Sequence, residues 1–430
     1  MVLAIAVPMT LAYVTTPLIG LVDTAVVGQL GDAALIGGLA AGAIVFDVVF
    51  STFNGLRSGT TGLVAQAFGR DDEHEQRLVL MRAFLLAVLV GLAIAVLSPL
   101  ISLGGQSFMG AEPAVNAALD QYVRIRCLAA PFALINYAIL GYVLGRGEGS
   151  LGLSLQFLLN CVNIVMSILL GLHLGWGVTG VAWGAVIAEL VAMLAGLAIL
   201  ARRFRHMPRV RWSSVLDVGA VKAMLALNGD IMVRSFCLLA VFALFARQGA
   251  SLGTVTLAAN AVLFHLFMIA SFFLDGFATG AEQLAGRALG ARARAPFVRA
   301  VKLTALWGFG LAVAAVLAFL LFGSLLVSVM TSAEEVRTEA LRYLPWAAFA
   351  GLSGVLAFQM DGVFIGATWS RDMRNMMLVS LGAFVVALLL LQPSFVNNGL
   401  WAALHIFLLF RGLTLLSILR LRLPGVQSSG

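Results

Sequence analysis

The segment LRSGTTGLVAQAFG (56–69) has a counterpart 221 residues later in the chain, FATGAEQLAGRALG (277–290). The same shift aligns Gly141 with Gly362, well beyond the two segments. Glycine makes up 45 of the 430 residues, so a single Gly–Gly match is expected by chance about one time in ten. A register that is kept over so long a distance predicts an internal repeat, with two halves of the same fold.

The composition is that of a membrane protein. Hydrophobic residues make up 61% of the chain and charged residues 11%, and the mean hydropathy is +1.02. A soluble domain carries about 25% charged residues, and a disordered chain combines low hydrophobicity with high net charge. Both classes are therefore excluded, and we expect an all-α integral membrane protein.

The apolar stretches are long enough to cross a bilayer, which takes about 20 residues per helix. We expect twelve transmembrane helices in two pseudo-symmetric six-helix lobes around a central cavity, related as a parallel repeat. The predicted lobes are 1–205 and 224–430, joined by a cytoplasmic linker at 206–223, and residues 56–69 extend the second helix toward water. The predicted spans are 3–27, 33–54, 79–103, 122–145, 150–171, 177–201, 224–248, 255–277, 300–328, 341–366, 376–394 and 399–420.

Basic residues gather in the loops on one side of these spans, mainly in 202–222, 287–302 and 371–374. Because Lys and Arg mark cytoplasmic loops, we place this side and both termini in the cytoplasm and the protein in the inner (plasma) membrane. The isoelectric point near 9.9 then reflects this bias and does not indicate a nucleic-acid partner.

The sequence has none of the common motifs for catalysis or nucleotide binding. It contains no H-E-x-x-H, G-x-S-x-G or G-x-x-x-x-G-K-[ST] pattern. The three cysteines, Cys127, Cys161 and Cys237, lie in apolar runs without close spacing. We therefore expect no enzyme activity, no cofactor and no metal site, and an intramembrane enzyme is only a remote alternative.

Asp23 is the strongest candidate for function, because a charge inside a bilayer costs about 3 kcal/mol and needs a reason. It lies near the outer end of the first span, whose helix contains Pro8 and Pro17. Pro17 removes a backbone hydrogen bond and permits a kink six residues before the acid. An acid beside a bendable helix is suited to a protonation switch. The alternative is an interfacial residue that caps the helix end.

Two further acids have weaker claims. Asp230 and Arg234 stand four residues apart on one helix face, which predicts a structural ion pair. Asp361 is flanked by apolar residues in the tenth span. Its position fits a role in lining a substrate cavity and a role in packing equally well.

Three amides, Asn136, Asn160 and Asn163, lie within the fourth and fifth spans. Each needs a hydrogen-bond partner, since a buried unpaired amide costs about 1–3 kcal/mol. In one interpretation these amides join neighbouring helices. In the other they line the substrate cavity, and one of them holds the carboxylate of Asp23.

Several segments resemble the DinF branch of the MATE (multidrug and toxic compound extrusion) transporter family. The resemblance covers nearly the whole chain, with the motifs in one order. The matching segments are VDTAVVGQLGD (22–32), GLRSGTTGLVAQAFGR (55–70), NGDIMVRSF (228–236), LDGFATGAEQLAGRALGAR (274–292) and DGVFIGATWSRDMRN (361–375).

The resemblance implies residue roles as well as a fold. Asp23 falls on the first-helix aspartate that the family uses for cation coupling, and Asn163 and Asn136 match asparagines of the same pocket. Asp361 matches a tenth-helix acid that some relatives use in the other lobe. Ser167 departs from the pattern, since many relatives carry a second aspartate there, and the seventh span lacks a mid-membrane glutamate.

The expected function is therefore secondary active export of small organic cations or drugs, in exchange for H⁺ through Asp23. Na⁺ is the less favoured coupling ion, because the missing carboxylates weaken a Na⁺ site. The alternative is a flippase for lipids or lipid-linked saccharides built on the same two-lobe plan. The expected partners are the substrate and the lipid bilayer, and a monomer is sufficient.

Overall fold

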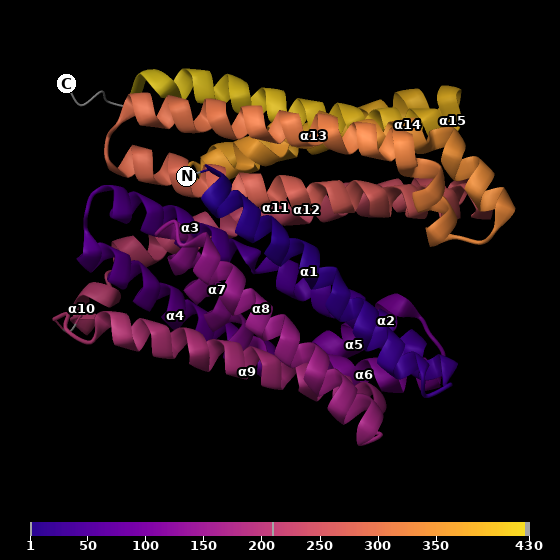
Figure 1. The fold of residues 1–430 in the computed structure, drawn as a ribbon, viewed down its shortest axis with the longest axis horizontal. Helices are drawn as coiled ribbons and strands as arrows, with labels where there is room; N and C mark the ends of the chain where they lie inside the picture. The colour runs from indigo at the N-terminus through magenta and orange to yellow at the C-terminus, as the bar shows by residue number, and fades with distance from the viewer. Residues whose placement is uncertain (1, 209, 426–430) are drawn as a thin grey trace. The chain divides into compact units, whose positions relative to one another are not determined.

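The computed structural model describes residues 2–208 and 210–425, and the regular elements within these ranges are helices (Figure 1). A π-helix (Ser167–His173) continues α8, and a 3₁₀ turn (Leu423–Gly425) follows α15. The α-helices are α1 (Val2–Gly28), α2 (Ala33–Thr52), α3 (Asn54–Gly69), α4 (Glu73–Val96), α5 (Ser98–Met109), α6 (Pro113–Leu128), α7 (Ala130–Gly145), α8 (Gly149–Met166), α9 (Gly177–Phe204), α10 (Trp212–Val215), α11 (Val218–Ser251), α12 (Thr254–Gly290), α13 (Arg294–Met330), α14 (Glu334–Gly366) and α15 (Ser370–Arg422).

Ten helical stretches in the described ranges are long and apolar enough to cross a membrane. The pair α6 and α7, which meet at a bend of 51°, makes an eleventh. α15 divides into two at Val396, where φ is 52° and ψ is −122°. Its two arms fold back on each other. As a result, Arg422 near the end of α15 donates a hydrogen bond to Asp372 near its start, at 2.7 Å. The ten stretches, the bent pair and the second arm of α15 together give the predicted twelve spans within the described part of the chain.

The chain divides into two compact units. The first unit is Leu11–Asn228, and the second unit is Gly229–Gly430 together with Met1–Thr10. The helices α1 and α11 therefore each begin in one unit and continue in the other. This division differs from the predicted lobes in the first ten residues and in residues 224–228, and it assigns the predicted linker to the first unit.

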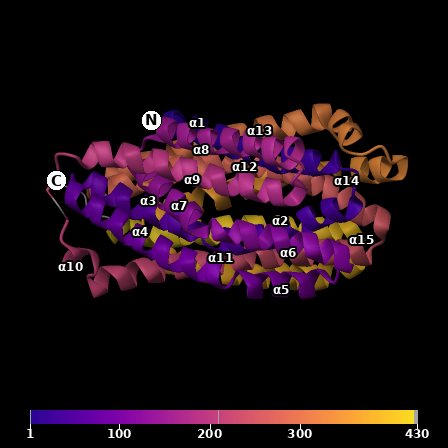
Figure 2. The ribbon, with the colours of Figure 1, turned by 90° about the horizontal axis from the view of Figure 1, so that it is seen from below.

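Within the first unit, α3 packs against α4 and α7 (Figure 1). α2 lies along α6, and α5 packs against both of these helices (Figure 2). Within the second unit, α12 packs against α13 and α14, and α14 against α15. Each unit has its own apolar core, with Leu119 and Val123 in the first and Phe267, Trp401 and Phe407 in the second.

The repeat in the sequence is also a repeat in packing. Gly141 of α7 lies so close to α3 that a Cβ atom would stand 2.6 Å from the carbonyl oxygen of Arg57. Gly362 of α14 meets α12 in the same way, with 2.2 Å to the carbonyl oxygen of Ala278. Arg57 and Ala278 are also 221 residues apart. Since lipid offers no hydrophobic drive for helix association, such close backbone approach holds the helices of each unit together.

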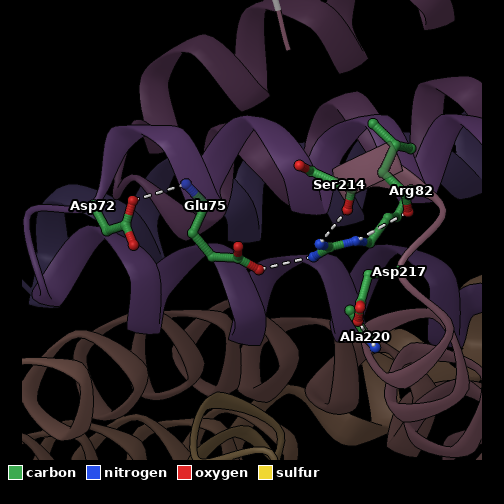
Figure 3. Close-up of polar contacts among 7 residues, drawn as sticks. Asp72, Glu75, Arg82, Ser214, Asp217 and Ala220 are labelled. Atoms are coloured by element: carbon green, nitrogen blue, oxygen red, sulfur yellow. Dashed lines mark hydrogen bonds and ion pairs between the residues drawn. The ribbon is translucent and has the colours of Figure 1, made fainter. Parts of the chain in front are cut away.

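The segment after α9 is held against α4 by Arg82. Its guanidinium donates to the backbone carbonyls of Ser214 at 2.9 Å and Val215 at 3.3 Å, and to the carboxylate of Glu75 at 2.8 Å (Figure 3). Arg82 is 6% exposed, so these are largely desolvated, charge-assisted hydrogen bonds. The predicted linker at 206–223 is therefore anchored along one helix of the first unit.

Candidate functional site: an acid-rich cluster in the first unit

Asp23 lies in the first-unit part of α1 and is 6% exposed. α1 is helical without interruption through Pro8 and Pro17. The neighbours of the Asp23 carboxylate include the hydroxyls of Ser167 and Tyr122 and the guanidinium of Arg126. The Oδ1 atom of Asp23 has no hydrogen-bond partner among the described residues. A buried acid with an unsatisfied oxygen is costly in the charged form, and taking up a proton lowers that cost.

One face of α8 and the following π-helix runs along α1. Asn160 donates to the hydroxyl of Thr15 at 2.8 Å, which joins α8 to α1. Ser167 begins the π-helix, where its hydroxyl donates to Asn163 at 3.4 Å. Asn163 therefore contacts Ser167, the residue that departs from the family pattern and that also neighbours Asp23. π-helical turns are rare and often occur at functional sites.

Arg126 of α6 is a cation close to these acids, and the sequence analysis did not single it out. Its guanidinium stacks on the ring of Phe46 at 3.9 Å. It interacts electrostatically with Asp23 of α1, Asp47 of α2 and Glu189 of α9. Three acids of the first unit therefore lie within electrostatic range of Arg126. No local pattern in the sequence relates these positions, because they come from four helices.

Asn136 of α7 binds an acid, but not the one expected from the resemblance. Its side-chain amide donates to the Glu189 carboxylate at 2.7 Å and to the Glu189 backbone carbonyl at 2.9 Å. The role of Asn136 in the pocket of Asp23, which the resemblance implies, stays a prediction. The amide holds a different acid of the same cluster.

In the second unit, Asp361 of α14 binds two arginines, Arg234 of α11 and Arg411 of α15. The predicted ion pair between Asp230 and Arg234 is wrong. Asp230 instead accepts from the guanidinium of Arg374 and from the hydroxyl of Ser370, both at 2.7 Å. The two residues share a helix face as expected, but partners from α14 and α15 neutralise each of them.

The second unit also contains an aromatic cavity of about 170 Å³. Asn260 lies at its edge and is fixed by the amide of Asn397 at 2.7 Å and the indole of Trp401 at 2.9 Å. Its amide therefore joins helices. The cavity is lined by Phe242, Phe245, Ala246, Gly249, Leu257, Asn260, Ala261, Phe264 and His265.

The model of the MatE family matches residues 8–169 and again residues 231–391, once in each half of the chain. The chain belongs to the MatE family. A similar protein is "DNA damage-inducible protein F" of Escherichia coli (strain K12), 36% identical over 97% of this chain and 91% of that protein. "Protein DETOXIFICATION 44, chloroplastic" of Arabidopsis thaliana is 27% identical over 95% of this chain and 80% of its own length.

The fold agrees with solved MATE structures. An outward-facing multidrug resistance MATE family transporter of the MOP superfamily has a TM-score of 0.87 at 17% identity, over 99% of this chain and 96% of that one. A MATE structure in the bent conformation has a TM-score of 0.89. The predicted two-lobe, twelve-helix fold and the resemblance to MATE transporters are thus confirmed. In the described part of the chain, no group of three acidic, His or Cys side chains is arranged to hold a metal ion.

Proposed function

We propose that this MatE-family chain exports organic cations or drugs in exchange for protons, and that Asp23 carries the proton. The observation that carries the proposal is a buried carboxylate with an unsatisfied oxygen, beside Arg126, on a helix that contains Pro17. The names of related proteins support the substrate class. One is "Probable multidrug resistance protein NorM" of Agrobacterium fabrum, which is 26% identical over 62% of this chain.

The mechanism needs two states of the cluster. With Asp23 charged, its attraction to Arg126 holds α1 against the other helices of the first unit. Protonation removes that charge and frees Arg126 for Asp47 and Glu189, and α1 bends at Pro17 because one backbone hydrogen bond is already missing there. The altered first unit binds the substrate less tightly and releases it. Coupling follows when proton and substrate prefer different states.

A proton suits the cluster better than Na⁺. Hard cations need several oxygen ligands, and Arg126 faces the acids of the first unit with a positive charge that repels any second cation. In the second unit, the Asp361 carboxylate already binds two guanidiniums. We therefore assign no cation site to Asp361, although the resemblance suggested one.

The orientation follows the charge bias of the loops, so we propose that the protein lies in the inner (plasma) membrane with both termini in the cytoplasm. It needs no cofactor in this mechanism. Because one chain supplies both halves of the duplicated fold, we propose a functional monomer.

The test is transport by purified protein in proteoliposomes. We expect an imposed pH gradient alone to drive movement of a fluorescent organic cation, without Na⁺, and Asp23→Asn to abolish that movement. Asp372→Asn is the matched control, because this acid pairs with Arg422 at the end of α15 and should retain transport. Full gradient-driven transport by Asp23→Asn, or a strict need for Na⁺ in the wild type, would contradict the proposal.

A further inference from the structure

The Asp361 cluster in the second unit has more positive than negative charge. Arg234, Asp361 and Arg411 come from three helices, and their side chains are 14%, 7% and 2% exposed. One carboxylate oxygen, Oδ2, accepts from both guanidiniums. Within the described residues, neither arginine forms an ion pair with any other acid. The cluster therefore carries a net charge of +1 in a nearly dry interior.

The unused hydrogen-bonding atoms are mainly donors. Arg411 leaves Nε and Nη1 without partners in the described part of the chain, and Arg234 leaves Nε, whereas Asp361 leaves only Oδ1. Buried polar groups are nearly always satisfied, so these donors indicate a missing acceptor. Phe358 contacts Arg411 at 5.6 Å through its ring face, which stabilises the cation without cancelling its charge. A water molecule would satisfy a donor but would leave the charge.

A second ion pair in the same unit shows how a purely structural acid is held. Asp230 has one arginine, Arg374, and one hydroxyl, Ser370, so that its charges balance. Arg374 is also 34% exposed, where water screens it. The Asp361 cluster has one arginine too many and far less water. An excess buried cation costs several kcal/mol unless a counter-charge accompanies it.

We propose that Arg234, Asp361 and Arg411 form a binding site for a monovalent anion, held by the free donors of Arg411 and Arg234. The shared chemistry is a single negative charge with hydrogen-bond acceptors, as in chloride or in the carboxylate of a small molecule. Asp361 orients the two guanidiniums, and the bound anion neutralises the cluster. The proposal is independent of proton exchange at Asp23, which lies in the other unit.

The experiment measures the thermal unfolding midpoint of purified protein in detergent at constant ionic strength. The sodium salt of HEPES, a bulky sulfonate that carries no carboxylate, is replaced stepwise by sodium chloride in one arm and by sodium acetate in the other. Because a ligand that binds only the folded state raises stability, we expect a saturable rise in the midpoint. A rise with chloride assigns the site to a dissolved halide, and a rise with acetate alone assigns it to a carboxylate. The absence of a saturable rise with either anion overturns the proposal.

Variants locate the effect. In Arg411→Gln, one arginine and one carboxylate remain and the cluster is neutral, so we expect anion affinity to fall about ten- to a hundredfold. Arg422→Gln is the control, because it removes an exposed arginine from α15 and should retain the saturable response. An unchanged response in Arg411→Gln would overturn the assignment to this cluster.

Direct binding keeps the proposal testable even if Arg411→Gln does not fold. Equilibrium dialysis of the wild-type protein with radioactive chloride should show saturable binding that bromide displaces. In the carboxylate case, labelled acetate replaces chloride as the bound probe. Transport in proteoliposomes without chloride or acetate separates the two proposals. If the anion response is lost there, proton exchange through Asp23 should still drive transport.

Discussion

The two units share a helical scaffold, but the buried acid of each unit has different partners. Each acid leaves one oxygen without a hydrogen bond, but among the described residues Asp23 of the first unit forms no ion pair, whereas Asp361 of the second unit is bound by two arginines. Neither acid is repeated: Leu244 stands at the position equivalent to Asp23, and Leu140 at the position equivalent to Asp361. The repeat therefore carries the packing, and each unit adds its own charges. A buried acid without an ion pair suits a site that changes its protonation, and an acid bound by two arginines suits a fixed site.

The largest expected effect is at Asp361. Asp361→Asn leaves Arg234 and Arg411 buried without a carboxylate, and breaking a buried ion pair in this way costs about 3–5 kcal/mol. We expect a large fall in the thermal unfolding midpoint in detergent. Asp372→Asn, which loses a half-exposed pair with Arg422, should cost about 1 kcal/mol or less. Equal stability of the two variants would mean that the second unit does not depend on its bound acid.

The next effect tests the shared scaffold. Gly362→Ala places a Cβ atom 2.2 Å from the backbone of α12, and Gly141→Ala places one 2.6 Å from the backbone of α3. We expect each to cost about 1–3 kcal/mol through overpacking, with Gly362 the worse. Gly382→Ala in α15 has nothing within 4 Å and should instead stabilise its helix by about 0.5–1 kcal/mol. Thermal unfolding of the three variants checks this order. A lower unfolding midpoint in Gly382→Ala, with unchanged midpoints in Gly362→Ala and Gly141→Ala, would refute it.

The sequence was sufficient to predict the features that depend on local pattern. The register between 56–69 and 277–290 predicted the duplicated fold, and the apolar runs predicted the spans. The position of Asp23 in a proline-containing helix indicated a candidate acid. These features need only spacing and composition, which a single sequence carries.

The ion pairs could not be predicted, because they join segments that are far apart in the chain. The rule for residues four apart paired Asp230 with Arg234, but the side chain of Arg234 reaches Asp361, 127 residues away. Likewise, no spacing relates Arg126 to Glu189. Where several opposite charges are within reach, tertiary packing decides which of them meet, and helix-face rules only limit the choice.

The smallest expected effect on stability is at Asp23, and it separates function from folding. Asp23→Asn replaces a buried carboxylate with a neutral group of the same shape, so the desolvation cost of a charge disappears while the attraction to Arg126 is lost. These changes oppose each other, and we expect the unfolding midpoint to stay the same or to rise slightly. Transport driven by a pH gradient should nevertheless be absent. If Asp23→Asn instead destabilised the protein as strongly as Asp361→Asn, both acids would be structural, and the proton would have to be sought at Asp47 or Glu189. A stable but inactive variant leaves the difference between the units intact, because only the first unit would then hold an acid whose charge is needed for transport and not for folding.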